Sequence, residues 1–326
     1  MLFQADNSGF DVIGDVHGCY ESLVVLLDRL DYKDINGVYK HPTRQAIFLG
    51  DLIDRGSHIR ETLTLVCAME QAGSAKVILG NHEFNAIRYK QELDDYIVND
   101  VELPSTRLFR LMKETLLQLK EYPDDWFKFT KWFTTLPLFL DSDGFRAVHA
   151  CWDSRLIDEY RKKYNTTHLS QEFIEASKEA TSLEHQIVDR LTRGTSLALP
   201  EGVNVESEDG FIRRFFRTKF WADSPKTYGD IVFQPDPLPY DLVDHPIKKD
   251  EKSNLVQYSP DDPPVFFGHY WLKGRPKPLL SNVACLDYSA VNFGRLTAYR
   301  FSGESCLVEK NFLWVFVEPI DDKANE

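Results

Sequence analysis

The sequence has few cysteines and no long hydrophobic run. Its 326 residues contain five cysteines, and no two of them form a Cys-x-x-Cys pair. This spacing argues against a cysteine-rich zinc site and favours reduced thiols. Compact apolar runs such as Leu23–Leu27 are far too short to span a bilayer. Because residues 1–9 also lack a basic stretch followed by an apolar segment, we expect a soluble, cytoplasmic protein without membrane partners.

Basic residues are in the minority. There are 38 Lys and Arg against 51 Asp and Glu, which gives a formal net charge of −13. Such a charge argues against a groove for nucleic acid. It leaves room for a small phosphorylated substrate, because bound divalent cations reverse the electrostatic field locally. Hydrophobic residues make up 43% of the chain and aromatic residues 13%, so we expect one elaborated α/β domain over residues 1–326.

Five apolar runs are each followed by polar residues that commonly bind metals or phosphate. Short apolar runs bounded by glycine are typical of buried strands. The runs cover residues 10–13, 46–49, 77–79, 145–148 and 265–267. Helical patterns follow three of them, at residues 21–30, 59–72 and 82–91. Since ligands of α/β sheets bind at the carboxyl ends of strands, the pattern predicts one shared crevice.

The polar residues at these strand ends fit a centre of two metal ions. The candidate ligands offer only oxygen and nitrogen donors, and they are Asp15, His17, Asp51, Asn81, His149 and His269. This set suits divalent transition metals, with manganese as the first choice and iron, zinc or nickel as alternatives. A carboxylate such as Asp51 can bridge two ions, which can then clamp both ends of a displacement at phosphorus.

Each segment taken alone also fits a purely structural role. Gly14–Gly18 could be a turn, and Asn81 could cap a helix that has Glu83 in its first turn. His149 could be a buried histidine with its hydrogen bonds satisfied. The metal-centre hypothesis therefore depends on all five segments occurring together, in order and at strand ends.

The segments GDVHG, GDLIDRG and GNHE resemble the metal-dependent phosphoesterases of the phosphoprotein phosphatase type, also called calcineurin-like. His149 and His269 match the two later histidine motifs of that family. Residues 285–288 and 294–300 resemble the C-terminal strands of bacterial symmetrical diadenosine-tetraphosphatases. The resemblance covers residues 10–90, 136–153 and 263–302. It implies a two-sheet β-sandwich flanked by helices in four layers, with inserts at about 92–135 and 154–262.

The resemblance also implies roles for single residues. The first ion would be held by Asp15, His17 and Asp51, and the second by Asp51, Asn81, His149 and His269. A hydroxide between the ions would attack phosphorus, and His82 would protonate the leaving oxygen. Asp54 would orient His82, and Arg55 would grip the phosphate oxygens. General chemistry agrees, because a histidine paired with a carboxylate is a common general acid and a guanidinium matches two phosphate oxygens.

A second phosphate-binding arginine is expected from the later insert. Related phosphatases use one from this part of the chain, but the motifs do not identify it. The candidates are Arg193, Arg213, Arg214 and Arg217. We expect one of them to point at the metal crevice and the others to form surface ion pairs.

The sequence thus predicts a phosphoric-ester hydrolase. The leading interpretation is a phosphoprotein-phosphatase-like enzyme acting on monoesters of a phosphorylated protein or small molecule. The first alternative is a symmetrical dinucleoside tetraphosphate hydrolase. A non-catalytic, phosphate-binding regulatory protein is the second alternative, and the intact Asp54–His82 pair counts against it. Substrate specificity resides in the inserts, so the sequence identifies neither the physiological substrate nor the oligomeric state.

Overall fold

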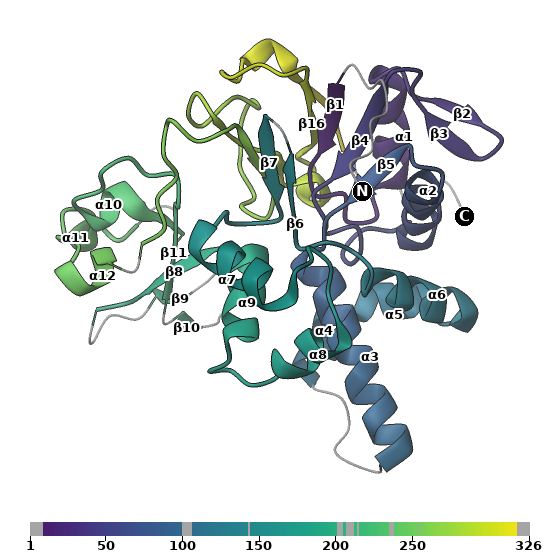
Figure 1. Ribbon diagram of the computed structural model, residues 1–326, viewed down its shortest axis with the longest axis horizontal. Helices are drawn as coiled ribbons and strands as arrows, with labels where there is room; N and C mark the ends of the chain where they lie inside the picture. The colour runs from purple at the N-terminus through teal and green to yellow at the C-terminus, as the bar shows by residue number, and fades with distance from the viewer. Residues whose placement is uncertain are drawn as a thin grey trace.

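Two β-sheets form the centre of the computed structural model, and helices lie outside them (Figure 1). The structure describes residues 9–99, 106–142, 144–200, 205–206, 212–213, 215–234, 238–253 and 255–317. The first sheet has the order β15-β16-β1-β4-β5, with β17 paired to β16. Its strands are β1 (Gly9–Ile13), β4 (Arg44–Phe48), β5 (Ala75–Val77), β15 (Asp287–Tyr288), β16 (Arg295–Phe301) and β17 (Phe312–Phe316). The second sheet has the order β14-β13-β7-β6 and contains β6 (Phe139–Ser142), β7 (Phe145–Val148), β13 (Val265–Phe267) and β14 (Val283–Cys285).

The two sheets pack face to face. Val12 and Ile47 of the first sheet share one buried cluster with Ala147 and Phe266 of the second. Their chain neighbours, such as Ile13, belong to a second cluster that includes the apolar faces of the flanking helices. Successive side chains of a strand point to opposite faces, so each central strand serves both clusters. This arrangement confirms the predicted β-sandwich flanked by helices.

Strands β1, β4 and β5 run parallel and end at the same edge of the first sheet. Each leads through a motif loop into a helix: α1 (Tyr20–Arg29), α2 (Ile59–Gln71) and α3 (Asn81–Asn99). Helix α1 packs on β16 and β17, and α2 packs on β5. The predicted helices are confirmed, although α3 extends further than expected. Strand β5 lies two residues before the predicted position, because the Leu79 N–H bonds to the carbonyl of Pro137 instead of continuing the ladder with β4.

Further helices and small sheets fill the regions between the motifs. After α3 come α4 (Thr106–Leu111), α5 (Lys113–Leu119) and α6 (Pro123–Phe133), and after β7 come α7 (Ser154–Tyr164), α8 (Gln171–Ala176) and α9 (Leu183–Arg193). The next region contains β8 (Thr195–Ala198), β9 (Val205–Glu206), β10 (Ile212–Arg213), β11 (Phe215–Thr218) and β12 (Val232–Gln234). It also contains three short helices that the sequence did not predict: α10 (Tyr228–Ile231), α11 (Tyr240–Val243) and α12 (Lys249–Ser253). Strands β2 (Lys33–Ile35) and β3 (Val38–Lys40) form a hairpin, and the short 3-10 helices are η1 (Ala290–Asn292) and η2 (Glu309–Asn311). The division into one domain with two inserts stays a prediction.

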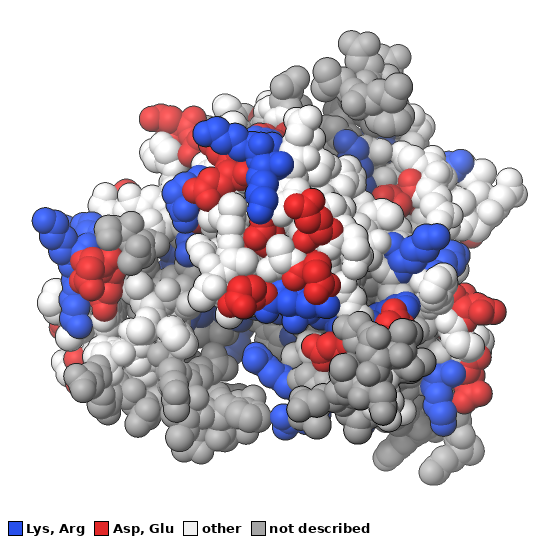
Figure 2. Space-filling view, turned by 60° about the horizontal axis from the view of Figure 1, so that its bottom comes forward, with Lys and Arg blue, Asp and Glu red and all other residues white. Residues whose placement is uncertain are grey.

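Charged side chains are distributed in small groups of both signs on the face that Figure 2 shows. Within the described ranges, no helix is both long enough and apolar enough to cross a membrane.

Candidate active site

The loops of the first two motifs are held together by backbone hydrogen bonds. The N–H groups of Val16 and His17 donate to the carbonyl of Asp51 at 3.2 and 2.9 Å, and the Gly18 N–H donates to Leu52 at 2.9 Å. His17 and Asp51 adopt positive φ values of 45° and 52°. Such values are uncommon for residues other than glycine and concentrate at functional sites. The first two motif loops therefore fix each other's conformation.

Glu83 fixes the position of Asp51 from the start of α3. One of its carboxylate oxygens accepts from the N–H groups of Asp51 and Gly80 at 2.9 and 3.1 Å, and the other accepts from Leu52 at 2.7 Å. Glu83 is fully buried. Burial is the largest cause that raises the pKa of Glu83, and the negative charge of Asp51 is the next largest. The sequence placed Glu83 in the first helical turn but missed this role. The three hydrogen bonds join the start of the second motif to the third motif.

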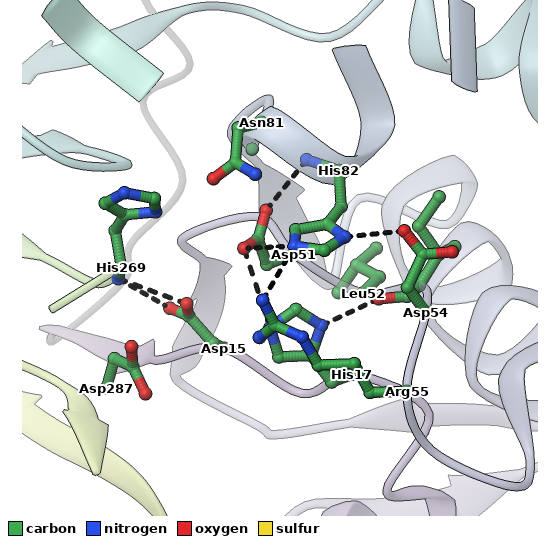
Figure 3. A network of polar contacts seen from close by, with 12 residues as sticks. Asp15, His17, Asp51, Leu52, Asp54, Arg55, Asn81, His82, His269 and Asp287 are labelled. Atoms are coloured by element: carbon green, nitrogen blue, oxygen red, sulfur yellow. Dashed lines mark hydrogen bonds and ion pairs between the residues drawn. The ribbon is translucent and has the colours of Figure 1, made fainter. Parts of the chain in front are cut away.

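Asp51 faces two different groups of histidines, and Figure 3 shows the first of them, His17 and His82, beside it. Its Oδ2 lies 3.5 Å from His17 Nε2 and 3.7 Å from His82 Nε2, whereas its Oδ1 lies 3.3 Å from His149 Nε2. This arrangement gives two sets of possible metal-binding atoms. One set comes from His17, Asp51 and His82, and the other comes from Asp51, His149 and His269. Within each set, the donor atoms lie within 4.8 Å of one another. The carboxylate shared by both sets is the one that the sequence predicted to bridge.

The histidine rings are oriented as metal-binding imidazoles are. Nδ1 of His17 lies 2.7 Å from the carbonyl of Ile53, and Nδ1 of His149 lies 2.7 Å from that of Leu49. A carbonyl partner makes Nδ1 the donor, so in the neutral ring the Nε2 lone pair is directed at the crevice. His269 Nε2 is buried without a hydrogen-bond partner among the described residues. Because an unpaired buried polar atom is costly, His269 Nε2 fits a bound cation.

Asp15 lies outside both sets, although the sequence predicted it as a ligand of the first ion. Its oxygens lie 3.1 and 3.3 Å from the backbone N–H of His269, which donates to them. A Cβ at position 268 would come within 1.9 Å of an Asp15 oxygen, so only glycine fits there. Burial, followed by the charge of the buried Asp287, raises the pKa of Asp15 well above its usual range. A nearby cation would relieve the repulsion between these two carboxylates.

Asp54, His82 and Arg55 form a chain of contacts beside Asp51. Nδ1 of His82 lies 2.5 Å from Asp54 Oδ2 and donates to it. The guanidinium of Arg55 donates to His82 Nε2 at 3.1 Å and to His17 Nε2 at 2.7 Å. Asn81, which directly precedes His82, places its side-chain amide 3.2 Å from His149 Nε2. The structure thus brings all of these sequence-predicted residues to one place.

Helix α5 supports the second motif loop, a role that the sequence motifs did not indicate. The hydroxyl of Thr115 donates to the Asp54 carboxylate and accepts from the Asp54 N–H at 3.0 Å. Gln118 donates to the Gly56 carbonyl and accepts from the Ile59 N–H, both at 2.8 Å. Helix α5 therefore holds the loop that carries Asp54 and Arg55.

Trp271 is a second residue that the motifs did not reveal. The guanidinium carbon of Arg55 lies 4.2 Å from the centre of the Trp271 ring, a cation–π contact. The Trp271 backbone has φ 52°, and its N–H donates to Asp287 Oδ2 at 2.8 Å. Asp287 thereby positions the ring on which the Arg55 guanidinium rests.

Of the four candidate arginines, Arg217 lies against the metal crevice. Its guanidinium donates to the carbonyl of His269 at 3.3 Å. The pKa of His269 lies well below its usual range. Burial is the largest cause, and the positive charge of Arg217 is the next largest. Arg213 lies in strand β10, and Arg214 lies outside the described residues.

Arg193 lies at a different border of the same region. Its guanidinium donates to the side-chain oxygen of Asn85 at 2.9 Å and to Asp189 at 3.4 Å. Asn85 lies one helical turn after Asn81 on α3. Arg193 therefore reaches the helix that carries His82, and part of its charge is balanced by Asp189.

The fold and the motif loops agree with a known family. The calcineurin-like phosphoesterase family model matches residues 9–270. The chain belongs to this family, as the sequence motifs predicted, and is thus a member of a family of phosphoester-hydrolysing enzymes.

Individual relatives are similar over shorter stretches. The asymmetrical bis(5'-nucleosyl)-tetraphosphatase PrpE of Halalkalibacterium halodurans is 38% identical over 111 residues, which cover 34% of this chain and 45% of that protein. The enzyme of the same name from Bacillus subtilis is 30% identical over 131 residues, covering 40% of this chain and 51% of the relative. The chain thus matches about half the length of these curated relatives. A solved Saccharomyces cerevisiae protein serine/threonine phosphatase aligns with a TM-score of 0.47 and 14% identity, over 98% of this chain and 82% of the other.

Proposed function

We propose that this protein hydrolyses phosphoric monoesters with the help of two divalent transition-metal ions, manganese being the first choice. The observation that carries the proposal is the Asp51 carboxylate shared by two buried ligand sets, with Arg55 and the Asp54–His82 pair beside it. The proposed ligands are Asp15, His17 and Asp51 for one ion, and Asp51, Asn81, His149 and His269 for the other. When bound, two such ions supply hydroxide at neutral pH and neutralise charge on the phosphoryl oxygens.

Arg55 is the proposed phosphate-binding residue. It is exposed, so a substrate can reach its guanidinium, and contacts with Trp271, His17 and His82 restrict where that group lies. A planar guanidinium pairs with two phosphate oxygens at once. Arg55 would therefore hold the phosphate next to the Asp51 carboxylate. Arg217 is the proposed second cation, because it lies against His269.

His82 is the proposed general acid. Asp54 accepts from Nδ1, so the second nitrogen, Nε2, faces the crevice. Once Arg55 pairs with the phosphate instead of with Nε2, a proton on Nε2 can pass to the leaving oxygen as the bond to phosphorus breaks. Asp54 also stabilises the positive charge that His82 carries before this transfer.

A leaving-group comparison tests the proposal. His82→Asn should lower turnover by roughly 10²–10⁴-fold on alkyl phosphates and phosphoserine peptides, whose leaving oxygens need a proton. The loss should be much smaller on p-nitrophenyl phosphate, whose leaving group is already a weak base. The control is His168→Asn, since His168 is exposed and lies outside the site. An equal loss on both substrate types would contradict the assignment of His82.

A second candidate function is hydrolysis of a dinucleoside tetraphosphate, because that substrate appears in the names of the relatives. Those relatives are named asymmetrical, whereas residues 285–300 suggested the symmetrical type. The products decide: symmetrical cleavage of diadenosine tetraphosphate gives two ADP, and asymmetrical cleavage gives ATP and AMP. Under the leading proposal, kcat/KM is higher for a phosphomonoester than for this compound.

The proposed compartment is the cytoplasm. All five cysteines are free thiols in the described structure, which supports a reducing environment.

A further inference from the structure

A cleft of about 590 Å³ opens beside the proposed phosphate site. Arg55 and Gly56 of the second motif loop form one wall. Residues at the start of α1 and around the ends of η1 and β17 form the others, including Val25, Phe293 and Phe316. Arg55 belongs both to this cleft and to the contacts around His82. A molecule whose phosphate is held by Arg55 can therefore extend its organic part into the cleft.

Two aromatic rings at the cleft are exposed. Phe293 and Phe316 each retain 62% of their accessible surface. Large aromatic side chains gain most of their stabilisation from burial, so two exposed rings at one cleft need an explanation beyond packing. The guanidinium of Arg295 lies 4.6 Å from the centre of the Phe316 ring and fixes the position of that ring.

The backbone holds Phe293 in an unusual conformation. Its φ is 55°, which is rare for a bulky residue. The following Gly294 approaches the Tyr288 and Ser289 carbonyls so closely that a Cβ there would lie 2.1 and 2.6 Å from them. The tight turn after η1 thus directs an aromatic ring towards the cleft at a cost in backbone strain. Strain of this kind is concentrated at ligand-binding sites.

The lining favours a flat, neutral group. Among the described residues that line the cleft, the charged ones are Arg55 and Glu21, so beyond Arg55 a polyphosphate would meet a carboxylate and no second cation. Aliphatic side chains such as Val25 and Val291 provide an apolar surface, and Ser22 and Ser57 add hydroxyl groups. An apolar pocket with a few polar groups and two aromatic rings suits a nucleobase, which stacks on aromatic rings and hydrogen-bonds at its edge.

We propose that this cleft binds the nucleobase of a phosphoester substrate whose phosphate is held by Arg55. The substrate class is then a nucleoside phosphate, or a polyphosphate whose further phosphate groups lie outside the cleft. This inference rests on the proposed function for the position of the phosphate, but the base-binding residues Phe293 and Phe316 are separate from the proposed metal ligands.

Binding of adenosine tests the cleft without any hydrolysis. Adenosine carries no phosphate, and its binding to the metal-free protein can be followed by saturation-transfer NMR. Phe293→Ala should weaken binding roughly 5- to 100-fold, because one base stacked on one aromatic ring contributes about that much. Phe316→Ala should act in the same direction. The matched control is Phe109→Ala on α4, since Phe109 is also half exposed but remote from the cleft.

Kinetics give an independent measurement. In Phe293→Ala, the ratio of kcat/KM for diadenosine tetraphosphate or AMP to that for p-nitrophenyl phosphate should fall by a similar factor. If kcat/KM falls equally for both classes of substrate, so that the ratio is unchanged, the cleft does not select a base and the proposal is overturned.

The outcomes separate the two proposals. If adenosine does not bind the wild type at millimolar concentration, or binds Phe293→Ala and Phe316→Ala as tightly as the wild type, the base-binding proposal is wrong even where phosphoesters are hydrolysed. If adenosine binding depends on both rings but no phosphoester is hydrolysed with any metal, the cleft assignment stands and the proposed function is wrong.

Discussion

Asp51 and His149 determine each other's charge in the metal-free protein. Burial acts to raise the pKa of Asp51, but the neighbouring His149 and His82 outweigh it and hold that pKa well below the usual range. Conversely, burial acts to lower the pKa of His149, and Asp51 outweighs it and raises that pKa to about 10. Without metals, the crevice therefore contains a buried ion pair between Asp51 and His149, which metal binding would replace.

This ion pair predicts how stability depends on pH. The folded-state pKa of His149 is about 10, above its ordinary value of 6.5, so its contribution is complete below pH 6.5 and is lost as the pH rises through 10. We expect the urea unfolding free energy of the metal-free protein to fall between about pH 7 and pH 9, by at most about 1.4 kcal/mol per pH unit for this one proton. His149→Gln should reduce the slope, and an identical slope in the variant would show that His149 does not titrate in this range.

Arg217 should contribute to both substrate binding and turnover. Arg217→Ala should raise KM and lower kcat together, with a loss in kcat/KM of roughly 10²-fold, because phosphate charge is present in both the ground and transition states. The control is Arg155→Ala, which removes an exposed ion pair with Glu159. Such a pair contributes about 0–1 kcal/mol of stability and nothing to the site. If the kinetics of the two variants are the same, Arg217 is not the second phosphate-binding cation.

Helix α5 is the element that fixes Asp54. Thr115→Val should leave the Asp54 N–H and one Asp54 carboxylate oxygen without their hydrogen-bond partner. Because a hydrogen bond to a charged group is among the stronger ones, its loss should lower turnover by about 10-fold. The loss should be larger for alkyl phosphates than for p-nitrophenyl phosphate, because Thr115 acts through Asp54 on His82. Thr115→Ser should restore turnover. Thr130→Val on α6 is the control, since that buried hydroxyl bonds to the Trp126 carbonyl of its own helix. If Thr115→Val lowers stability but leaves the dependence of turnover on the leaving group unchanged, Thr115 has a structural role only.

The motif-bearing strands and loops were predictable because their signals are local. A run such as Phe10–Ile13 followed by Gly14 and Asp15 shows both the buried strand and the ligand in one short segment. The supporting contacts were not predictable, since they join segments that are distant in the sequence. Thr115 contacts Asp54 across 61 residues, and the Trp271 N–H contacts Asp287 across 16 residues. The end of β5 was misplaced for the same reason, because its limit is set by Pro137.

The candidate metal centre depends on the packing of the two sheets against each other. Asp15 and Asp51 follow strands of the first sheet, whereas His149 and His269 follow β7 and β13 of the second. Ions bound by both groups would link the two sheets and would bind the folded chain only. Metal binding should therefore raise the melting temperature in a concentration-dependent way, which calorimetry in a manganese titration would show.

Metal content measured together with activity tests the central claim most directly. Elemental analysis of the wild type should find about two transition-metal ions per chain, and chelation should abolish phosphoester hydrolysis until manganese is restored. Asp51→Asn should lose both ions, because one carboxylate serves both ligand sets. Asp28→Asn is the control, since Asp28 is exposed and pairs with Lys33 far from the site. Full activity in metal-free protein would contradict the account.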